Sequence, residues 1–274
     1  MRPFAAGDAC MLYDERGRTY LIELIAGKDF HYHRGVLPHD RVIGTPDGSS
    51  FLSSKGSRLV ALRPRLADYV LKMQRGATVL YPKDAGAILE WADIAEGMTV
   101  LEAGTGSGGL TMVLTRAVGG SGRVVSVERR EDHAALARKR IAGFFGEIPS
   151  HLELRVGDVV DAIGDVGAER IVLDVPEPWH SVPAAAAHLP GGGILCAYLP
   201  TVPQVQTLRS TIDDAGCFLD VETFEILMRG WAVSGRSVRP EHRMVGHTGF
   251  ITVARKFLTE PIATSGEAET DPNA

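Results

Sequence analysis

Residues 100–111 read VLEAGTGSGGLT, an apolar run that leads into a group of glycines and then into a segment with helical spacing. Gly104, Gly106 and Gly109 fit the spacing G-x-G-x-x-G, which follows a strand and opens a helix in nucleotide-binding α/β domains. Glycines let the backbone turn tightly and let a ligand approach it closely. The stretch therefore predicts the first strand–loop–helix unit of such a domain.

The sequence beyond this stretch alternates strands and helices. Strand-like apolar segments occur at 99–103, 123–128, 152–156, 170–174 and 193–199, and helix-like segments at 110–118, 131–145 and 204–215. This alternation predicts an α/β fold with a parallel, doubly wound sheet. Two late strand-like segments, 217–227 and 249–256, have no helix between them and predict an antiparallel final hairpin, which brings the sheet to seven strands.

The N-terminal part of the chain has a different pattern. Residues 1–70 contain short alternating segments and many turn residues, which predict a small β domain with a helical linker near its end. Residues 71–258 then form the main domain. Residues 259–274 are polar and rich in small side chains, which predicts a disordered tail.

Composition limits the class of protein. The chain has 274 residues, 45% of them apolar, and a net charge of −5. Its three cysteines have no paired spacing, which favours a reducing cytoplasm over a disulfide framework or a zinc ribbon. We find no signal peptide and no apolar run long enough to span a bilayer, so we expect a cytoplasmic protein without membrane association.

Acidic residues at successive strand ends narrow the choice of cofactor. Glu128 can accept both ribose hydroxyls of an adenosine-containing cofactor, which fits a nicotinamide dinucleotide or S-adenosylmethionine. Glu102, two residues before the first glycine, would repel a pyrophosphate but suits a sulfonium or amino group. Asp158 ends the third strand, where it can read an adenine amino group. The pattern favours S-adenosylmethionine and leaves a NAD enzyme as the minor alternative.

Further motifs carry a family resemblance. They are RGATVLYPKDAGAIL (75–89), LDVPEPW (173–179), GGGILCAYLPTVPQVQ (191–206), RGWAVSGRSVRPEHRMVGHTGFITVAR (229–255) and FHYHRGVLPHD (30–40). Together they resemble the single-subunit bacterial and archaeal tRNA (adenine-58-N1)-methyltransferase family over residues 5–256. The resemblance implies a class I methyltransferase sheet, a homotetramer, S-adenosylmethionine as methyl donor and tRNA as partner. It leaves open whether position 57 is also methylated.

The resemblance also implies roles for individual residues. Asp174 should face the target base, and Tyr81 should lie near both cofactor and base, so these two are the predicted catalytic residues. The predicted cofactor-binding residues are Glu102, Gly104, Thr105, Gly106, Ser107, Gly108, Gly109, Leu110, Glu128, Arg129, His133, Asp158, Val159 and Asp174. Trp179 either stacks on the base or supports the turn around it.

Two basic spans could contact RNA phosphates in this acidic chain. The first contains Arg58, Arg63, Arg65, Lys72, Arg75 and Lys83, and the second Arg229, Arg236, Arg239, His242, Arg243 and His247, with Trp231 among them. Some of these arginines could instead make ion pairs between subunits. His31, His33 and His39 have a loose metal-like spacing, but the reaction needs no metal and we predict none.

Two alternative functions remain. A non-catalytic tRNA-binding subunit of the same fold should lose the glycine loop or the acid of the fourth strand, and here both are present. A protein methyltransferase of the isoaspartyl type would leave the D-V-P-E-P-W turn and the basic C-terminal span without a purpose.

Overall fold

The computed structural model describes residues 2–74 and 79–259. Its main sheet has seven strands in the order β12-β15-β11-β10-β7-β8-β9. These are β7 (Thr99–Ala103), β8 (Arg123–Glu128), β9 (Leu152–Val156), β10 (Arg170–Leu173), β11 (Ile194–Leu199), β12 (Phe218–Phe224) and β15 (Phe250–Lys256). Strands β7 to β11 run parallel, and β15 is antiparallel to both β11 and β12. The predicted α/β sheet with an antiparallel final pair is confirmed.

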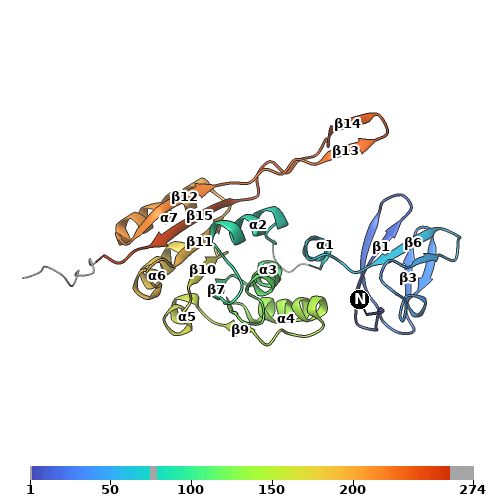
Figure 1. Cartoon of the computed structure of the whole chain (residues 1–274), viewed down its shortest axis with the longest axis horizontal. Helices are drawn as coiled ribbons and strands as arrows, with labels where there is room; N and C mark the ends of the chain where they lie inside the picture. Colours follow the sequence, from blue (N-terminus) through green and yellow to red (C-terminus); the bar gives the residue numbers. More distant parts are fainter. Residues whose placement is uncertain (1, 75–78, 260–274) are drawn as a thin grey trace, which may run out of the picture.

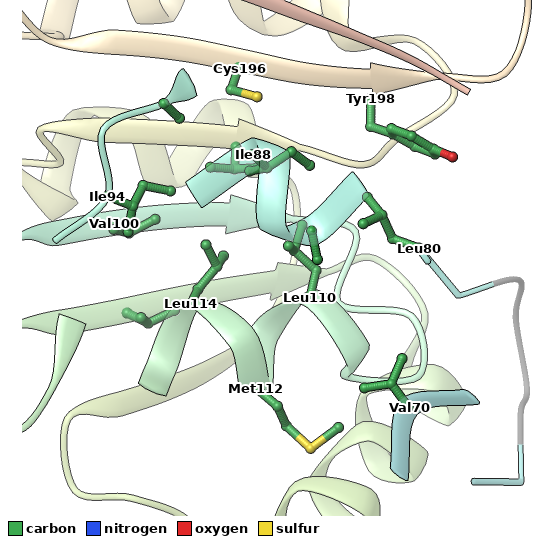
Figure 2. Packing of buried hydrophobic residues seen from close by; sticks show 14 of the residues in the cluster. Val70, Leu80, Ile88, Ile94, Val100, Leu110, Met112, Leu114, Cys196 and Tyr198 are labelled. Atoms are coloured by element: carbon green, nitrogen blue, oxygen red, sulfur yellow. The ribbon is translucent and has the colours of Figure 1, made fainter. Parts of the chain in front are cut away.

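Helices cover both faces of this sheet (Figure 1). They are α1 (Leu66–Lys72), α2 (Pro82–Trp91), α3 (Gly109–Val118), α4 (Glu131–Phe145), α5 (Val159–Val166), α6 (Val182–His188) and α7 (Val202–Ala215). Successive strand residues point to opposite faces, so Val100 joins the core with α1 to α4, shown in Figure 2, whereas Leu101 joins the core with α5 to α7. Burial on both faces explains why the strands read as continuous apolar runs.

The connection between the last two strands of the sheet is a long excursion that the sequence analysis did not describe. Between β12 and β15 the chain leaves the sheet as an arm, residues 227–247, which carries the antiparallel pair β13 (Trp231–Ser234) and β14 (Ser237–Pro240) (Figure 1, orange). The turn of this hairpin is Gly235-Arg236, and Gly235 has a φ of 55°. Glycine at the first position of a two-residue hairpin turn is the sequence signal that identifies the arm.

The N-terminal residues form a separate β structure with its own core. Its main sheet has the order β2-β1-β6-β5, and a second pair, β3-β4, precedes a short 3-10 helix. The elements are β1 (Ala9–Asp14), β2 (Thr19–Glu23), β3 (Asp29–Tyr32), β4 (Gly35–Pro38), η1 (His39–Arg41), β5 (Ser50–Leu52) and β6 (Arg58–Leu62). The exact domain boundary stays a prediction, and most of the predicted tail, residues 260–274, lies outside the described residues.

Candidate active site

The glycine loop lies directly against the end of β10. Gly104 has a φ of 90°, and a Cβ at this position would lie 2.0 Å from the carbonyl oxygen of Asp174. Gly108, with a φ of 82°, precedes α3, and a Cβ there would lie 3.0 Å from Cγ1 of Ile141 in α4. The glycines therefore allow the loop to pack between the end of β10 and α4. At position 104 any side chain would clash with the backbone of Asp174.

Glu128 braces the same loop from the end of β8. Its Oε2 accepts a hydrogen bond from the amide of Gly106 at 2.9 Å, and its Oε1 accepts one from the amide of Arg130 at 3.0 Å. The side chain is largely buried, but each carboxylate oxygen has a further lone pair. Glu128 can thus hold the loop and still accept hydroxyl protons from a ligand.

A cavity of about 780 Å³ opens over the carboxyl ends of β7, β8, β9 and β10. This is the edge of an open α/β sheet where ligands bind. The cavity is lined by Ala103, Gly104, Gly106, Val127, Glu128, Arg129, Arg130, His133, Gly157, Asp158, Val159, Val160, Asp174, Val175, Pro176, Glu177, His180 and Ser181. Eight of the predicted site residues therefore meet around one cavity: Gly104, Gly106, Glu128, Arg129, His133, Asp158, Val159 and Asp174.

Asp158 and Arg129 form one end of the cavity. Oδ1 of Asp158 caps α5 by accepting a hydrogen bond from the amide of Val160 at 2.9 Å. Its Oδ2 lies 3.7 Å from Nε of Arg129, and both side chains are well exposed. An exposed pair of this kind contributes little to stability, so both groups are available to a ligand.

Asp174 lies on the other side of the glycine loop. Its amide donates to the carbonyl oxygen of Ala103 at 2.8 Å, which fixes its backbone to β7. Burial raises the pKa of its carboxyl to about 7. Among the described residues, no hydrogen bond to this carboxyl is found. A desolvated carboxyl without a partner is available for a substrate.

The remaining predicted residues in and beside the glycine loop do not line the cavity wall. They are Glu102, Thr105, Ser107, Gly108, Gly109 and Leu110, all buried. Glu102 is fully buried, and burial raises the pKa of its carboxyl to about 7. The register pairs it with Ser126 of β8, whose hydroxyl lies 2.6 Å from that of Thr105. Direct cofactor contact by these residues stays a prediction.

The D-V-P-E-P-W segment enters a short helix before the motif ends. After β10 the chain makes a bend and enters a 3-10 helix, η2 (Pro178–Ser181), at Pro178, because proline is tolerated in a first helical turn. Trp179 is half-buried, packs against the core beside α5 to α7, and is absent from the cavity wall. Glu177 and His180 line the cavity, which the sequence did not predict, although Glu177 lies within the quoted motif and His180 directly follows it.

Tyr81 caps α2 and is half-buried, outside the cavity wall. The sequence reasoning missed Tyr198 at the end of β11. Because Leu173 pairs with Ala197 in the parallel register, Asp174 and Tyr198 are the next residues on neighbouring strands. The position of a tyrosine at a strand end next to the fourth-strand acid is the signal that could have identified it.

Most basic side chains of the first span form ion pairs or hydrogen bonds with other groups of the same chain. The prediction for Lys83 was wrong, because its side chain is only 8% exposed and pairs with Asp84 at 2.6 Å. Arg63 pairs with Asp8, Arg65 with Asp68, and Lys72 donates to a backbone carbonyl. Arg75 lies outside the described residues.

The second basic span lies on the arm. Arg229, Arg236, Arg239, His242 and Arg243 are exposed, and Trp231 is 58% exposed among them. His247 differs, because its ring contacts Glu225 and the carbonyl of Pro200, both at 2.9 Å. The arm therefore presents five exposed basic side chains in addition to His247.

Neither a metal-binding cluster nor a membrane-spanning helix occurs in residues 2–74 and 79–259. No group of three potential ligands that could hold a metal ion occurs there. Of the three N-terminal histidines, His39 is buried and accepts a hydrogen bond from the amide of Ile25, whereas His33 contacts Arg18. None of the helices in these residues is both long and apolar enough to cross a bilayer.

Comparison with known proteins identifies the family. A family model described as tRNA methyltransferase complex GCD14 subunit matches residues 58–242, and one described as TrmI-like N-terminal matches residues 3–50. The chain belongs to the GCD14/TrmI family.

Members of the GCD14/TrmI family match the chain along most of its length. The tRNA (adenine(58)-N(1))-methyltransferase TrmI of Thermus thermophilus is 37% identical, over 90% of this chain and 96% of the relative. The tRNA (adenine(57)-N(1)/adenine(58)-N(1))-methyltransferase TrmI of Methanocaldococcus jannaschii is also 37% identical, over 94% and 98%.

Solved structures of similar proteins support the same family and fold. TrmI from Aquifex aeolicus, a tRNA (m1A58) methyltransferase, superposes with a TM-score of 0.81 at 30% identity, over 94% of this chain and all of the other. A SAM-dependent O-methyltransferase from Thermotoga maritima has a TM-score of 0.88 at 31% identity, over 95% and 97%. The resemblance inferred from the motifs and the class I methyltransferase fold are both confirmed.

Proposed function

We propose that the chain transfers a methyl group from S-adenosylmethionine to N1 of adenine-58 in the T-loop of tRNA. The observation that carries this proposal is the position of Asp174, a partly desolvated carboxyl at the end of β10, beside Gly104 and the 780 Å³ cavity. The non-catalytic alternative is not favoured, because the glycine loop and this acid are intact. The isoaspartyl-type alternative finds no support among the relatives named above.

The residues around the cavity fit S-adenosylmethionine. Gly104 and Gly106 line the cavity without side chains, so a ligand can approach the backbone of the loop. Glu128 would hold the ribose hydroxyls with its free lone pairs, and Asp158, with Arg129 and His133 beside it, would bind the adenine end. When bound, this cofactor supplies an electrophilic methyl group on a sulfonium.

The residues on the other side of the loop suit the target base. N1 of adenine carries a lone pair and no proton, so the chain has to position the base rather than deprotonate it. Asp174 would accept a hydrogen bond from the exocyclic amine and stabilise the positive charge that forms on the methylated ring. A guanine presents a carbonyl at the same position, which a carboxylate rejects. Asp174 therefore selects adenine and lowers the barrier, with Tyr81 close to the base.

We further infer a homotetramer in the cytoplasm, with residues 1–70 as the small β domain and residues 71–258 as the methyltransferase domain. Trp231, Val233 and Val238 are each more than half exposed on the arm. An isolated two-stranded hairpin is marginally stable in water, so an apolar face of this kind favours association. All three cysteines are buried free thiols, which suits a reducing compartment.

The decisive experiment is identification of the methylated nucleoside. The protein is incubated with labelled S-adenosylmethionine and an unmodified tRNA transcript, and the RNA is digested to nucleosides. We expect 1-methyladenosine from the transcript with adenine at position 58 and none when that position is changed. Label at position 57 would extend the proposal, whereas label only on a ribose oxygen or on protein would refute it.

A further inference from the structure

A buried polar cluster ties α2 to the base of the arm. Lys83 Nζ donates to Asp84 Oδ1 at 2.6 Å, to Thr248 Oγ1 at 2.6 Å and to the carbonyl oxygen of Ile226 at 2.7 Å. Thr248 Oγ1 in turn donates to Asp84 Oδ2 at 2.8 Å. Asp84 is fully buried. All three ammonium protons are used, as the burial of a charge requires. We name Lys83, Asp84 and Thr248 the lysine cluster.

The lysine cluster reaches both ends of the arm. Ile226 lies just after β12, and Thr248 lies just before β15, so one ammonium group holds together two points separated by the whole of residues 227–247. His247 makes a parallel connection, because its ring contacts both Glu225 and the carbonyl of Pro200. The base of the arm is therefore fixed relative to β11 and α2.

The same cluster adjoins Tyr81 and Tyr198. Tyr81 caps the helix whose first turn carries Lys83 and Asp84. The hydroxyl of Tyr198, the strand neighbour of Asp174, lies 3.5 Å from Asp84 Oδ2. A Cβ on Gly249 would lie 2.4 Å from Cζ of Tyr198, so the backbone that follows Thr248 packs directly on this ring. Figure 2 shows Tyr198 at the same end of the core as Leu80, the residue before Tyr81.

We propose that the lysine cluster is a positioning device for methyl transfer, which fixes Tyr198 beside Asp174 and holds the first turn of α2, which Tyr81 precedes. The inference rests on the function proposed above. Hydrogen bonds between buried charged groups hold their partners in one geometry. Displacement of a positioned group by 1 Å can cost about 100-fold in rate. Removal of one bond from the cluster should therefore reduce turnover more than it reduces cofactor binding.

Thr248→Val is the most informative variant. It removes the hydroxyl that joins Lys83 to Asp84 but leaves the ion pair and the bond to Ile226, whereas removal of either charge would leave the other buried and unpaired. Thr252→Val is the matched control, because Thr252 is a buried threonine of β15 whose hydroxyl pairs with Thr223, 2.9 Å away and outside the cluster. Thr248→Ser restores the hydroxyl.

At saturating tRNA and S-adenosylmethionine, we expect kcat of Thr248→Val to fall between about 10- and 100-fold. Its calorimetric Kd for the cofactor should change less than threefold, and Thr248→Ser and Thr252→Val should keep most of the wild-type kcat. A kcat within twofold of Thr252→Val, a rise in KM for tRNA alone, or failure of Thr248→Ser to restore turnover would overturn the inference. Failure of the proposed function is separate, because the wild-type enzyme would then form no 1-methyladenosine in the same assay.

Discussion

Replacement of Gly104 by alanine tests the architecture of the site most directly. The new Cβ would lie 2.0 Å from the carbonyl oxygen of Asp174, and real Cβ atoms essentially never approach closer than 3.0 Å, so loop and strand end must separate by 3.0 − 2.0 = 1.0 Å. The left-handed φ of 90° adds about 1–2 kcal/mol for an L-residue, and overpacking typically adds about 1–3 kcal/mol. We expect the free energy of unfolding to fall by about 2–5 kcal/mol.

Thermal unfolding and calorimetry measure both consequences. In a domain of this size each kcal/mol corresponds to about 2–4 °C, so the melting temperature should fall by roughly 4–20 °C. Cofactor binding should weaken at least about tenfold, because the displaced loop carries Gly106, which is bonded to Glu128. Gly157→Ala is the control: Gly157 lines the same cavity, but a Cβ there meets no atom within 4 Å. If Gly104→Ala melts within 1 °C of this control and binds the cofactor equally well, the reasoning is refuted.

Three further predictions concern charge and assembly. Asp174→Asn should lower kcat by about 100- to 1000-fold while the Kd for cofactor changes little. The kcat/KM of the wild-type enzyme should rise with pH as the Asp174 carboxyl, with a pKa of about 7, loses its proton. If kcat/KM of the variant rises with pH in the same way, this role of Asp174 is contradicted. Burial raises the pKa of Glu102 to about 7 from an ordinary 4.5, so between these pH values the folded state holds a proton that the unfolded state has lost. The stability of the wild-type protein should therefore fall as the pH rises from 4.5 to 7, and Glu102→Gln should abolish that part of the fall in melting temperature. Identical pH profiles of the two melting temperatures would exclude this contribution of Glu102. Trp231→Ser should shift the mass measured by light scattering below that of a tetramer without loss of cofactor binding, whereas an unchanged mass would exclude the arm from the interface.

Local sequence predicted the parts of the fold that depend on local chemistry. The five apolar runs from 99–103 to 193–199 predicted strands β7 to β11 to within one residue, because a strand buried on both faces has a simple composition. The glycine spacing located the loop, since few residues tolerate the backbone that Gly104 adopts. The acids at the strand ends also met at one edge, as parallel strands require.

Two of the misses involve contacts between distant segments. Lys83 reads as an exposed basic residue, but its partners Ile226 and Thr248 lie 143 and 165 residues further along the chain. Tyr198 lies beside Asp174 because of the register between β10 and β11, which the sequence alone does not give. None of these relations has a local signature.

The order of the strands has a consequence for synthesis on the ribosome. Strand β15 is inserted between β11 and β12, so β12 has no neighbour in the sheet until residues 250–256 have been made. Until then β11 has an unpaired edge, which is the feature that exposes nascent chains to aggregation. A ribosome that stalls within the arm would therefore present an intact glycine loop on an incomplete sheet. The sheet can therefore be completed only after the last strand has been synthesised.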